Sequence, residues 1–174
     1  MKESVRIILE EKVDSLWPLH FKIPKEIAEK FIEKDNKRIK CTINDTLTLH
    51  SAMLSNTDGY FIMLSKPNAK KLNIRLGELA QLEIEKDASP YGMPMPEEME
   101  MVLDSEIETL EYFEKLSPGK QRSLIHLVRK IKNPDIKVRR ALSIAEHLKR
   151  ENGLLDFKKL NEVIKEFNQR EKLF

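Results

Sequence analysis

The chain has 174 residues, of which 34% are charged and 6% are aromatic, and its formal net charge is +2. This length suits one or two small domains, and the composition is typical of a soluble globular protein with a well-hydrated surface. No apolar run reaches the roughly 18 residues of a membrane-spanning helix, and charges in the first dozen residues exclude a signal-peptide core. We therefore expect a cytoplasmic protein. A single cysteine, Cys41, excludes an internal disulfide and a thiolate metal cluster.

Apolar and polar residues alternate in the first half of the chain, and this period of two predicts β-strands. The alternating stretches are 5–9, 39–43, 47–49 and 82–84. Two turn signals, Asn44-Asp45 and Asn56–Gly59, interrupt them. The second turn predicts a hairpin between strands over 46–54 and 60–65.

A strand–helix–strand unit is repeated within this half. In the first copy Pro24 separates a strand from a short helix over 25–32, and a strand over 38–43 follows. In the second copy Pro67 precedes a helix over 68–73, and a strand over 79–86 follows. Proline is favoured in the first helical turn because its missing N–H would have no partner there. Together with a strand over 1–13 and the hairpin, the two units predict a small closed β-barrel over 1–90. Because one chain holds both units, we expect a monomer.

The hydrophobic period becomes helical after residue 95, which predicts a helical domain of four or five helices over 96–174. The expected fold class is therefore α+β. Helix starts are marked by proline or a capping residue at Pro96, Ser117-Pro118, Pro134 and Asp156, and Gly153 marks a helix end. The helix that starts at Pro134 is expected to bury an apolar stripe formed by Val138, Ala141, Leu142, Ala145 and Leu148.

Charge is strongly segregated in the helical half. Residues 97–116 carry eight acidic side chains against one lysine, whereas 117–150 carry ten Lys or Arg against two acids. Two interpretations stay open. Adjacent helices with opposite charge attract each other, or the basic surface is reserved for phosphate or an acidic partner.

The sequence lacks a recognisable catalytic constellation. Phosphate-binding loops, nucleophile elbows and metalloprotease motifs are missing. The histidines have no carboxylate or cysteine at ligand spacing, so we interpret all four as structural or surface residues: His20, His50, His126 and His147. Cys41 falls on the inward side of its strand and is expected in the core. We therefore expect no enzymatic activity, no metal and no cofactor.

Two groups of residues are candidates for binding. Basic side chains on both sides of the Asn133-Pro134 turn form a candidate anion or nucleic-acid site. They are Arg122, Arg129, Lys130, Lys137, Arg139 and Arg140. Aromatic residues are scarce beside them, which disfavours stacking on single-stranded bases. A second candidate is an apolar cleft between barrel and helices, lined by Trp17, Tyr60 and Tyr91, for a small molecule or peptide.

Both halves also resemble known domains. The residues of 17–87, among them Ile23-Pro24, Ile43-Asn44 and Leu76-Gly77-Glu78, are similar to a small β-barrel domain of unknown function that often precedes YdeI/OmpD-associated domains. The residues of 113–148, among them Leu116-Ser117 and Arg139-Arg140, resemble that helical bacterial domain, also labelled bacteriocin-protection.

The resemblance implies a barrel of the double-split type, shared with AbrB- and MazE-like transcription factors, and the family labels imply a role in envelope stress or peptide resistance. This chain departs from the helical family's pattern at two points. An Ala-Lys pair is replaced by Lys130-Ile131-Lys132, and a Thr-Arg pair by Lys137-Val138-Arg139.

Two functions from different classes follow as expectations. The first is a non-catalytic binding or stress-associated module with a protein or small-molecule partner. The second is a nucleic-acid-binding regulatory protein that uses the six basic side chains and the AbrB-like barrel.

Overall fold

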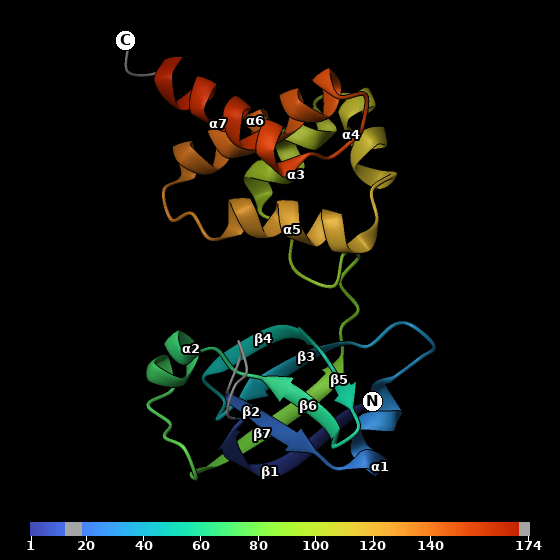
Figure 1. The fold of residues 1–174 in the computed structure, drawn as a ribbon, viewed down its shortest axis with the longest axis vertical. Coiled ribbons are helices and arrows are strands. Elements are labelled where there is room, and N and C mark those ends of the chain that lie inside the picture. Colours follow the sequence, from blue (N-terminus) through green and yellow to red (C-terminus); the bar gives the residue numbers. More distant parts are fainter. Residues whose placement is uncertain (13–18, 171–174) are drawn as a thin grey trace. The chain divides into compact units, whose positions relative to one another are not determined.

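A computed structural model describes residues 1–12 and 19–170 (Figure 1). The chain divides into two compact units, Met1–Gly92 and Met93–Phe174. The first is built mainly of strands and the second of helices, which confirms the α+β class. No helix in the described ranges is both long enough and apolar enough to cross a membrane.

The first unit is a curled, antiparallel, seven-stranded sheet. Its strands are β1 (Lys2–Glu11), β2 (Leu19–Ile23), β3 (Arg38–Ile43), β4 (Leu47–Ala52), β5 (Leu54–Asn56), β6 (Gly59–Met63) and β7 (Leu79–Lys86). Their order is β4-β3-β7-β1-β2-β6-β5. The long β1 pairs with β7 over its first residues and with β2 over its last, which joins the two parts of the sheet. Among the described strands no pairing links β4 to β5, so a closed, double-split barrel stays a prediction.

The predicted repeat is present, and its two copies pair with each other. The copies are offset by 41 residues, as seen from the helix starts Lys25 and Lys66 of α1 (Lys25–Ala28) and α2 (Lys66–Lys71). In the pairing of β2 with β6, Phe21 lies opposite Ile62, and these are equivalent positions of the two copies. In the pairing of β3 with β7, the equivalent residues Thr42 and Glu83 lie opposite each other. The two copies are therefore related by an approximate twofold axis.

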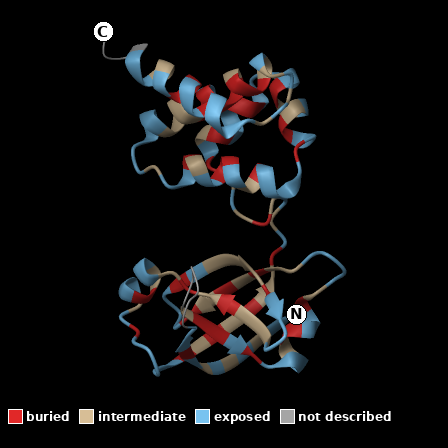
Figure 2. Ribbon diagram, viewed as in Figure 1, coloured by how far each residue is buried: buried red, intermediate tan, exposed pale blue. Residues whose placement is uncertain are grey.

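Each copy switches from strand to helix at the expected position. Pro24 is the N-cap of α1, which continues as a 3-10 turn over Glu29–Phe31. Ser65 is the N-cap of α2, where its hydroxyl accepts a hydrogen bond from the Asn68 amide at 3.3 Å, and a proline occupies the first turn. Equivalent alanines at positions 28 and 69 are both buried. The alternating side chains of both copies fill one apolar core. Figure 2 marks the buried residues along the strands of this unit.

The predicted central hairpin is only partly correct. Its turn at Asn56–Gly59 is present, but it connects the short β5 with β6. The preceding strand, β4, pairs along its whole length with β3. The reason is the Asn44-Asp45 turn, where both residues have positive φ and the Thr46 amide donates to the carbonyl of Ile43 at 3.0 Å. Such a tight two-residue turn fixes the β3–β4 hairpin.

The second unit contains five helices in its described residues: α3 (Glu97–Asp104), α4 (Ile107–Glu114), α5 (Pro118–Arg129), α6 (Pro134–Arg150) and α7 (Phe157–Arg170). The long α6 lies at the centre and contacts each of the other four (Figure 1). The N-caps of α3, α5 and α6 are Pro96, Ser117 and Asn133. The predicted helix starts at Pro96, Ser117-Pro118 and Pro134 agree with these caps. Four helices surrounding one central helix bury the apolar faces of all five.

One part of the predicted α6 stripe is wrong. Ala141, Ala145 and Leu148 are buried, but Leu142 is 42% exposed. The polar Ser143 and His147 are buried in its place. The Ser143 hydroxyl donates to the backbone carbonyl of Arg139 at 2.8 Å, and the His147 imidazole has a backbone partner described below. Because each polar side chain finds a nearby partner, it can be buried at low cost.

Candidate functional site

The six basic candidates have different environments. Arg122 lies half-buried on α5, and the exposed Arg129 and Lys130 lie at its C-terminal end. Lys137 forms an ion pair with Glu98 on α3 at 3.2 Å. Arg139 and Arg140 are half-buried on α6, and burial lowers the pKa of Arg140. The chain brings Arg129 and Lys130 close to the start of α6, but whether the six side chains bind one ligand together stays a prediction.

The acidic and basic segments contact each other directly. Besides the Glu98–Lys137 pair, Glu106 at the start of α4 accepts from Lys149 of α6 at 2.8 Å. The Lys149 and Thr109 hydrogen bonds lower the pKa of the Glu106 carboxyl. Opposite charge therefore holds neighbouring helices together at these two points, in agreement with the first of the two interpretations of the charge segregation.

The proposed aromatic cleft stays a prediction. Trp17 lies outside the described residues. Tyr60 is half-buried on β6, and its hydroxyl donates to the Glu29 carboxylate at 3.4 Å. Tyr91 is half-buried in the turn after β7.

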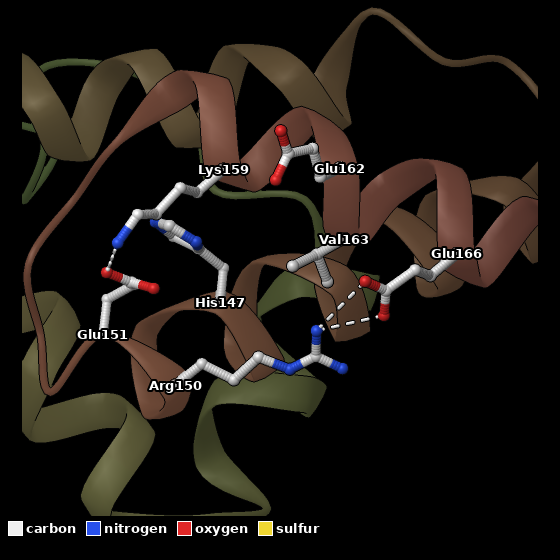
Figure 3. Close-up of a pocket in the computed structure, with 7 residues that line it drawn as sticks. All are labelled: His147, Arg150, Glu151, Lys159, Glu162, Val163 and Glu166. Carbon is white, nitrogen blue, oxygen red and sulfur yellow. Dashed lines mark hydrogen bonds and ion pairs between the residues drawn. The ribbon is translucent and has the colours of Figure 1, made fainter.

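A pocket of about 230 Å³ lies between the C-terminal end of α6 and α7 (Figure 3). It is lined by His147, Arg150, Glu151, Lys159, Glu162, Val163 and Glu166. Gly153 makes this arrangement by ending α6: it has a φ of +82°, and its amide donates to the Leu148 carbonyl at 2.7 Å. Asp156 then caps α7 by accepting from the amides of Lys158 and Lys159. The turn thus returns α7 along α6, as the sequence signals at both residues predict.

Most charged groups of the pocket are paired with each other. Arg150 donates to Glu166 through one guanidinium nitrogen and to Glu146 through another, at 3.0 and 2.8 Å. Lys159 pairs with Glu151. The carboxylate of Glu162 faces the same space in Figure 3, and within the described part of the chain it has no recorded hydrogen bond or ion pair. Glu162 is therefore the carboxylate of this pocket that makes no hydrogen bond or ion pair among the described residues, although, after the hydrogen bond to Glu151, its charge contributes to raising the pKa of Lys159.

His147 forms the buried wall of the pocket and is only 1% exposed. Its Nε2 accepts a hydrogen bond from the Asp156 amide at 3.2 Å. In the neutral ring this leaves the proton on Nδ1. Burial lowers the pKa of the imidazole, which favours this neutral form. The ring can therefore donate through Nδ1 but cannot accept a proton without losing its bond to Asp156.

Sequence reasoning did not find this pocket. Its residues come from two helices and the turn between them, and the one signal for their meeting is the stop at Gly153 followed by the cap at Asp156. The i, i+4 pair Glu146–Arg150 is visible in the sequence, but it is also what an ordinary solvated helix face shows. The pairing of Arg150 with Glu166 on the next helix depends on the fold and cannot be seen in the sequence.

A second polar cluster lies in the sheet unit. His50 of β4 forms a 2.8 Å hydrogen bond through Nδ1 with the carboxylate of Asp87, which follows β7. The other oxygen of this carboxylate accepts from the amide and the hydroxyl of Ser89. The Asp87 side chain is 2% exposed. Burial opposes its ionisation, but the bonds from Ser89 and His50 together lower its pKa. The cluster ties the turn after β7 to β4, a structural role of the kind predicted for the histidines.

The single cysteine lies in the core of the sheet unit. Cys41 is fully buried and burial raises the pKa of its thiol to about 12, so the core interpretation is correct. Among the described residues no three His, Cys, Asp or Glu side chains come close enough to hold a metal ion.

These features define a two-unit α+β protein in which a curled antiparallel sheet precedes a helical unit with a polar pocket. Residues 93–151 match the family described as bacteriocin-protection, YdeI or OmpD-associated. This match lies within the helical unit, as the resemblance implies, and the sheet is consistent with the accompanying N-terminal domain. No curated protein matches the chain. The family match covers α3 to α6 and ends at Glu151, so α7 and its side of the pocket lie beyond it.

Proposed function

We propose that this protein is a non-catalytic binding module whose helical unit holds a small ligand in the pocket between α6 and α7. The observation that supports it is the state of His147. Its Nε2 is occupied by the Asp156 amide and its Nδ1 carries the proton, so the ring serves as a fixed hydrogen-bond donor. A general base needs a free acceptor nitrogen, which this histidine lacks.

In this proposal two groups that line the pocket define the chemistry of the ligand. Glu162 offers a carboxylate that makes no hydrogen bond or ion pair among the described residues, and the Nδ1–H of His147, in the buried wall, offers a donor. A ligand with an ammonium group beside a carbonyl oxygen satisfies both. Pre-formed pairs around them, such as Arg150–Glu166, fix the walls before binding. A stress-associated role, suggested by the family description, would follow if the bound ligand is an amine-bearing peptide or metabolite.

Titration calorimetry with glycinamide and lysinamide tests this proposal. We expect saturable binding that Glu162→Gln weakens about 10- to 100-fold, since a charged hydrogen bond contributes roughly 1.5–3 kcal/mol. Glu100→Gln, an exposed carboxylate on α3, is the matched control and should leave binding unchanged. Equal binding by both variants would exclude the pocket as the site. A hydrolase or transferase activity that disappears in Glu162→Gln would instead make the protein an enzyme.

Nucleic-acid binding is the second candidate function. It is supported by Arg129 and Lys130, which are exposed at the end of α5 and have no recorded ion pair in the described structure. Against it, Lys137 is already paired with Glu98. If duplex DNA is bound, log affinity should fall with log salt at a slope of about −0.9 per phosphate contact. Arg139→Glu with Arg140→Glu should then weaken binding to every sequence equally in fluorescence anisotropy. No binding at low salt would eliminate this candidate.

A further inference from the structure

The two halves of the sheet repeat differ sharply in charge. Positions of α1 and α2 correspond with an offset of 41 residues, so Lys25 and Lys30 correspond to Lys66 and Lys71. At the position just before the second lysine, the 3-10 turn after α1 has Glu29 and α2 has Lys70. The symmetry that preserves the fold has therefore not preserved the charge of its two helices.

The basic side chains of α1 and of the 3-10 turn that continues it are neutralised by the protein itself. Lys25 pairs with Glu29 at 3.7 Å, and Lys30 pairs with Glu3 of β1 at 2.8 Å. An exposed pair of this kind leaves little net field at the surface.

The basic side chains of α2 and of the turn after it are exposed, and no ion pair is recorded for them in the described ranges. They are Lys66, Lys70, Lys71 and Arg75. The nearest acid in sequence, Glu78, accepts a hydrogen bond from the Arg75 amide at 2.8 Å. Even with Glu78 counted, the segment carries three net positive charges over 66–78. Figure 2 colours α2 and this turn mainly as exposed.

Exposed aliphatic side chains adjoin the basic segment. Leu76 and Leu79 are 55% and 56% exposed, and Ile8, which lies opposite Leu79 in the β1–β7 pairing, is 46% exposed. The turn is held beside this end of β1, because the Gly77 amide donates to the Leu9 carbonyl and the Leu9 amide donates to Glu78. We name these residues, with the four cations, the α2 surface. Exposed apolar area next to several cations is what interfacial binding to anionic lipid uses.

We propose that the α2 surface binds an anionic phospholipid membrane surface. Unpaired cations provide the charge complementarity, and Ile8, Leu76 and Leu79 provide apolar contacts that enter the headgroup region. A nucleic-acid backbone would be attracted by the same cations but would gain nothing from the three aliphatic side chains. This proposal is independent of the pocket in the helical unit.

Flotation of the full chain with vesicles of 70% phosphatidylcholine and 30% phosphatidylserine tests it. We expect binding to these vesicles, weak binding to pure phosphatidylcholine, and loss of binding as salt shortens the Debye length. Lys70→Ala with Lys71→Ala should weaken the partition coefficient about 30-fold, at roughly 1 kcal/mol per basic residue. The equivalent change in α1, Lys25→Ala with Lys30→Ala, is the matched control and should weaken it by less than about threefold.

A second variant separates lipid from other polyanions. Leu76→Ser with Leu79→Ser replaces exposed side chains, so folding is retained, which circular dichroism checks. It should reduce vesicle binding and leave any binding to a 20-base-pair DNA duplex unchanged. The proposal is overturned if wild type does not float with the anionic vesicles, or if α1 and α2 variants lose binding equally. Binding to duplex DNA that depends on Lys70 and Lys71, without vesicle binding, would assign the surface to nucleic acid.

Discussion

Replacing Gly153 by alanine should destabilise the helical unit through two separable effects. The residue has a φ of +82°, a left-handed conformation that costs an L-residue with a Cβ roughly 1–2 kcal/mol. The new Cβ would also lie 2.7 Å from Cδ1 and 3.2 Å from Cγ of Tyr112. The Tyr112 Cβ would also lie at 3.4 Å, so the crowded atoms are at the root of the side chain beside the α4 backbone, and a shift of the hydroxyl end would not relieve the contact. Overpacking of this kind costs typically 1–3 kcal/mol.

We therefore expect Gly153→Ala to lower the free energy of unfolding of the helical unit by about 2–5 kcal/mol. At roughly 4–8 °C per kcal/mol for a unit of this size, the Tm should fall by at least about 8 °C. Differential scanning calorimetry or urea unfolding followed by circular dichroism measures this. Because the two units can unfold separately, the transitions must be assigned before a two-state analysis is applied.

A double-mutant cycle tests the reasoning. In a Tyr112→Ala background the overlap is gone, so Gly153→Ala should cost only the conformational part of about 1–2 kcal/mol. Gly77→Ala is the control for that part, because Gly77 has a φ of +83° and no atom lies within 4 Å of its added Cβ. If Gly153→Ala costs the same with and without Tyr112, the contact with the ring contributes nothing and the argument from the 2.7 Å approach is wrong.

Three further predictions concern titratable groups. Burial lowers the folded-state pKa of His147 below its ordinary value of 6.5, so its contribution to stability is present above pH 6.5 and is lost as pH falls from there through the folded pKa. Unfolding of the helical unit should show this loss of stability, and His147→Gln should remove it. The pKa of Asp87 is also lowered in the folded state, so the sheet unit should lose stability as pH falls below about 3.8. If wild type and Asp87→Asn show the same flat dependence of stability on pH, the role of the His50 and Ser89 bonds is contradicted. Cys41 has a thiol pKa of about 12, so it should resist a thiol reagent at pH 8 in the folded protein and react after denaturation. Rapid labelling of the native protein would instead show that the core of the sheet unit opens easily.

Features set by local chemistry were predictable from the sequence. The strand-to-helix switches at Pro24 and before Pro67, the cap at Ser117 and the stop at Gly153 all depend on neighbouring residues, and the structure has them in place. The strand period was equally visible. The period does not say which strands pair with each other. The sequence therefore predicts that β4 pairs with β6, whereas the Asn44-Asp45 turn pairs β4 with β3.

Burial of polar residues on α6 was not predictable for a related reason. Leu142 is the more apolar choice, yet Ser143 and His147 face the interior because their partners, the carbonyl of Arg139 and the amide of Asp156, are supplied by the folded backbone. The second of these lies beyond the end of the helix. A sequence pattern ranks residues by hydrophobicity and cannot know which polar atoms will be satisfied. The pocket beside His147 was missed for the same reason.

The near-neutral net charge of +2 is weak evidence against an anionic partner, because the charges that make it up are not equivalent. In the helical unit, acids and bases such as Glu98 and Lys137 neutralise each other across helix contacts and contribute to the fold. In the sheet unit, Lys25 of α1 and Glu29 of the following 3-10 turn do the same, whereas the position in α2 equivalent to Glu29 is Lys70. The net charge of the whole chain does not show where cations without an ion-pair partner gather on the surface. The field that a partner meets is set locally, within about a Debye length of roughly 8–10 Å, and the comparison of the two repeat copies is therefore the better guide to where an anion would bind.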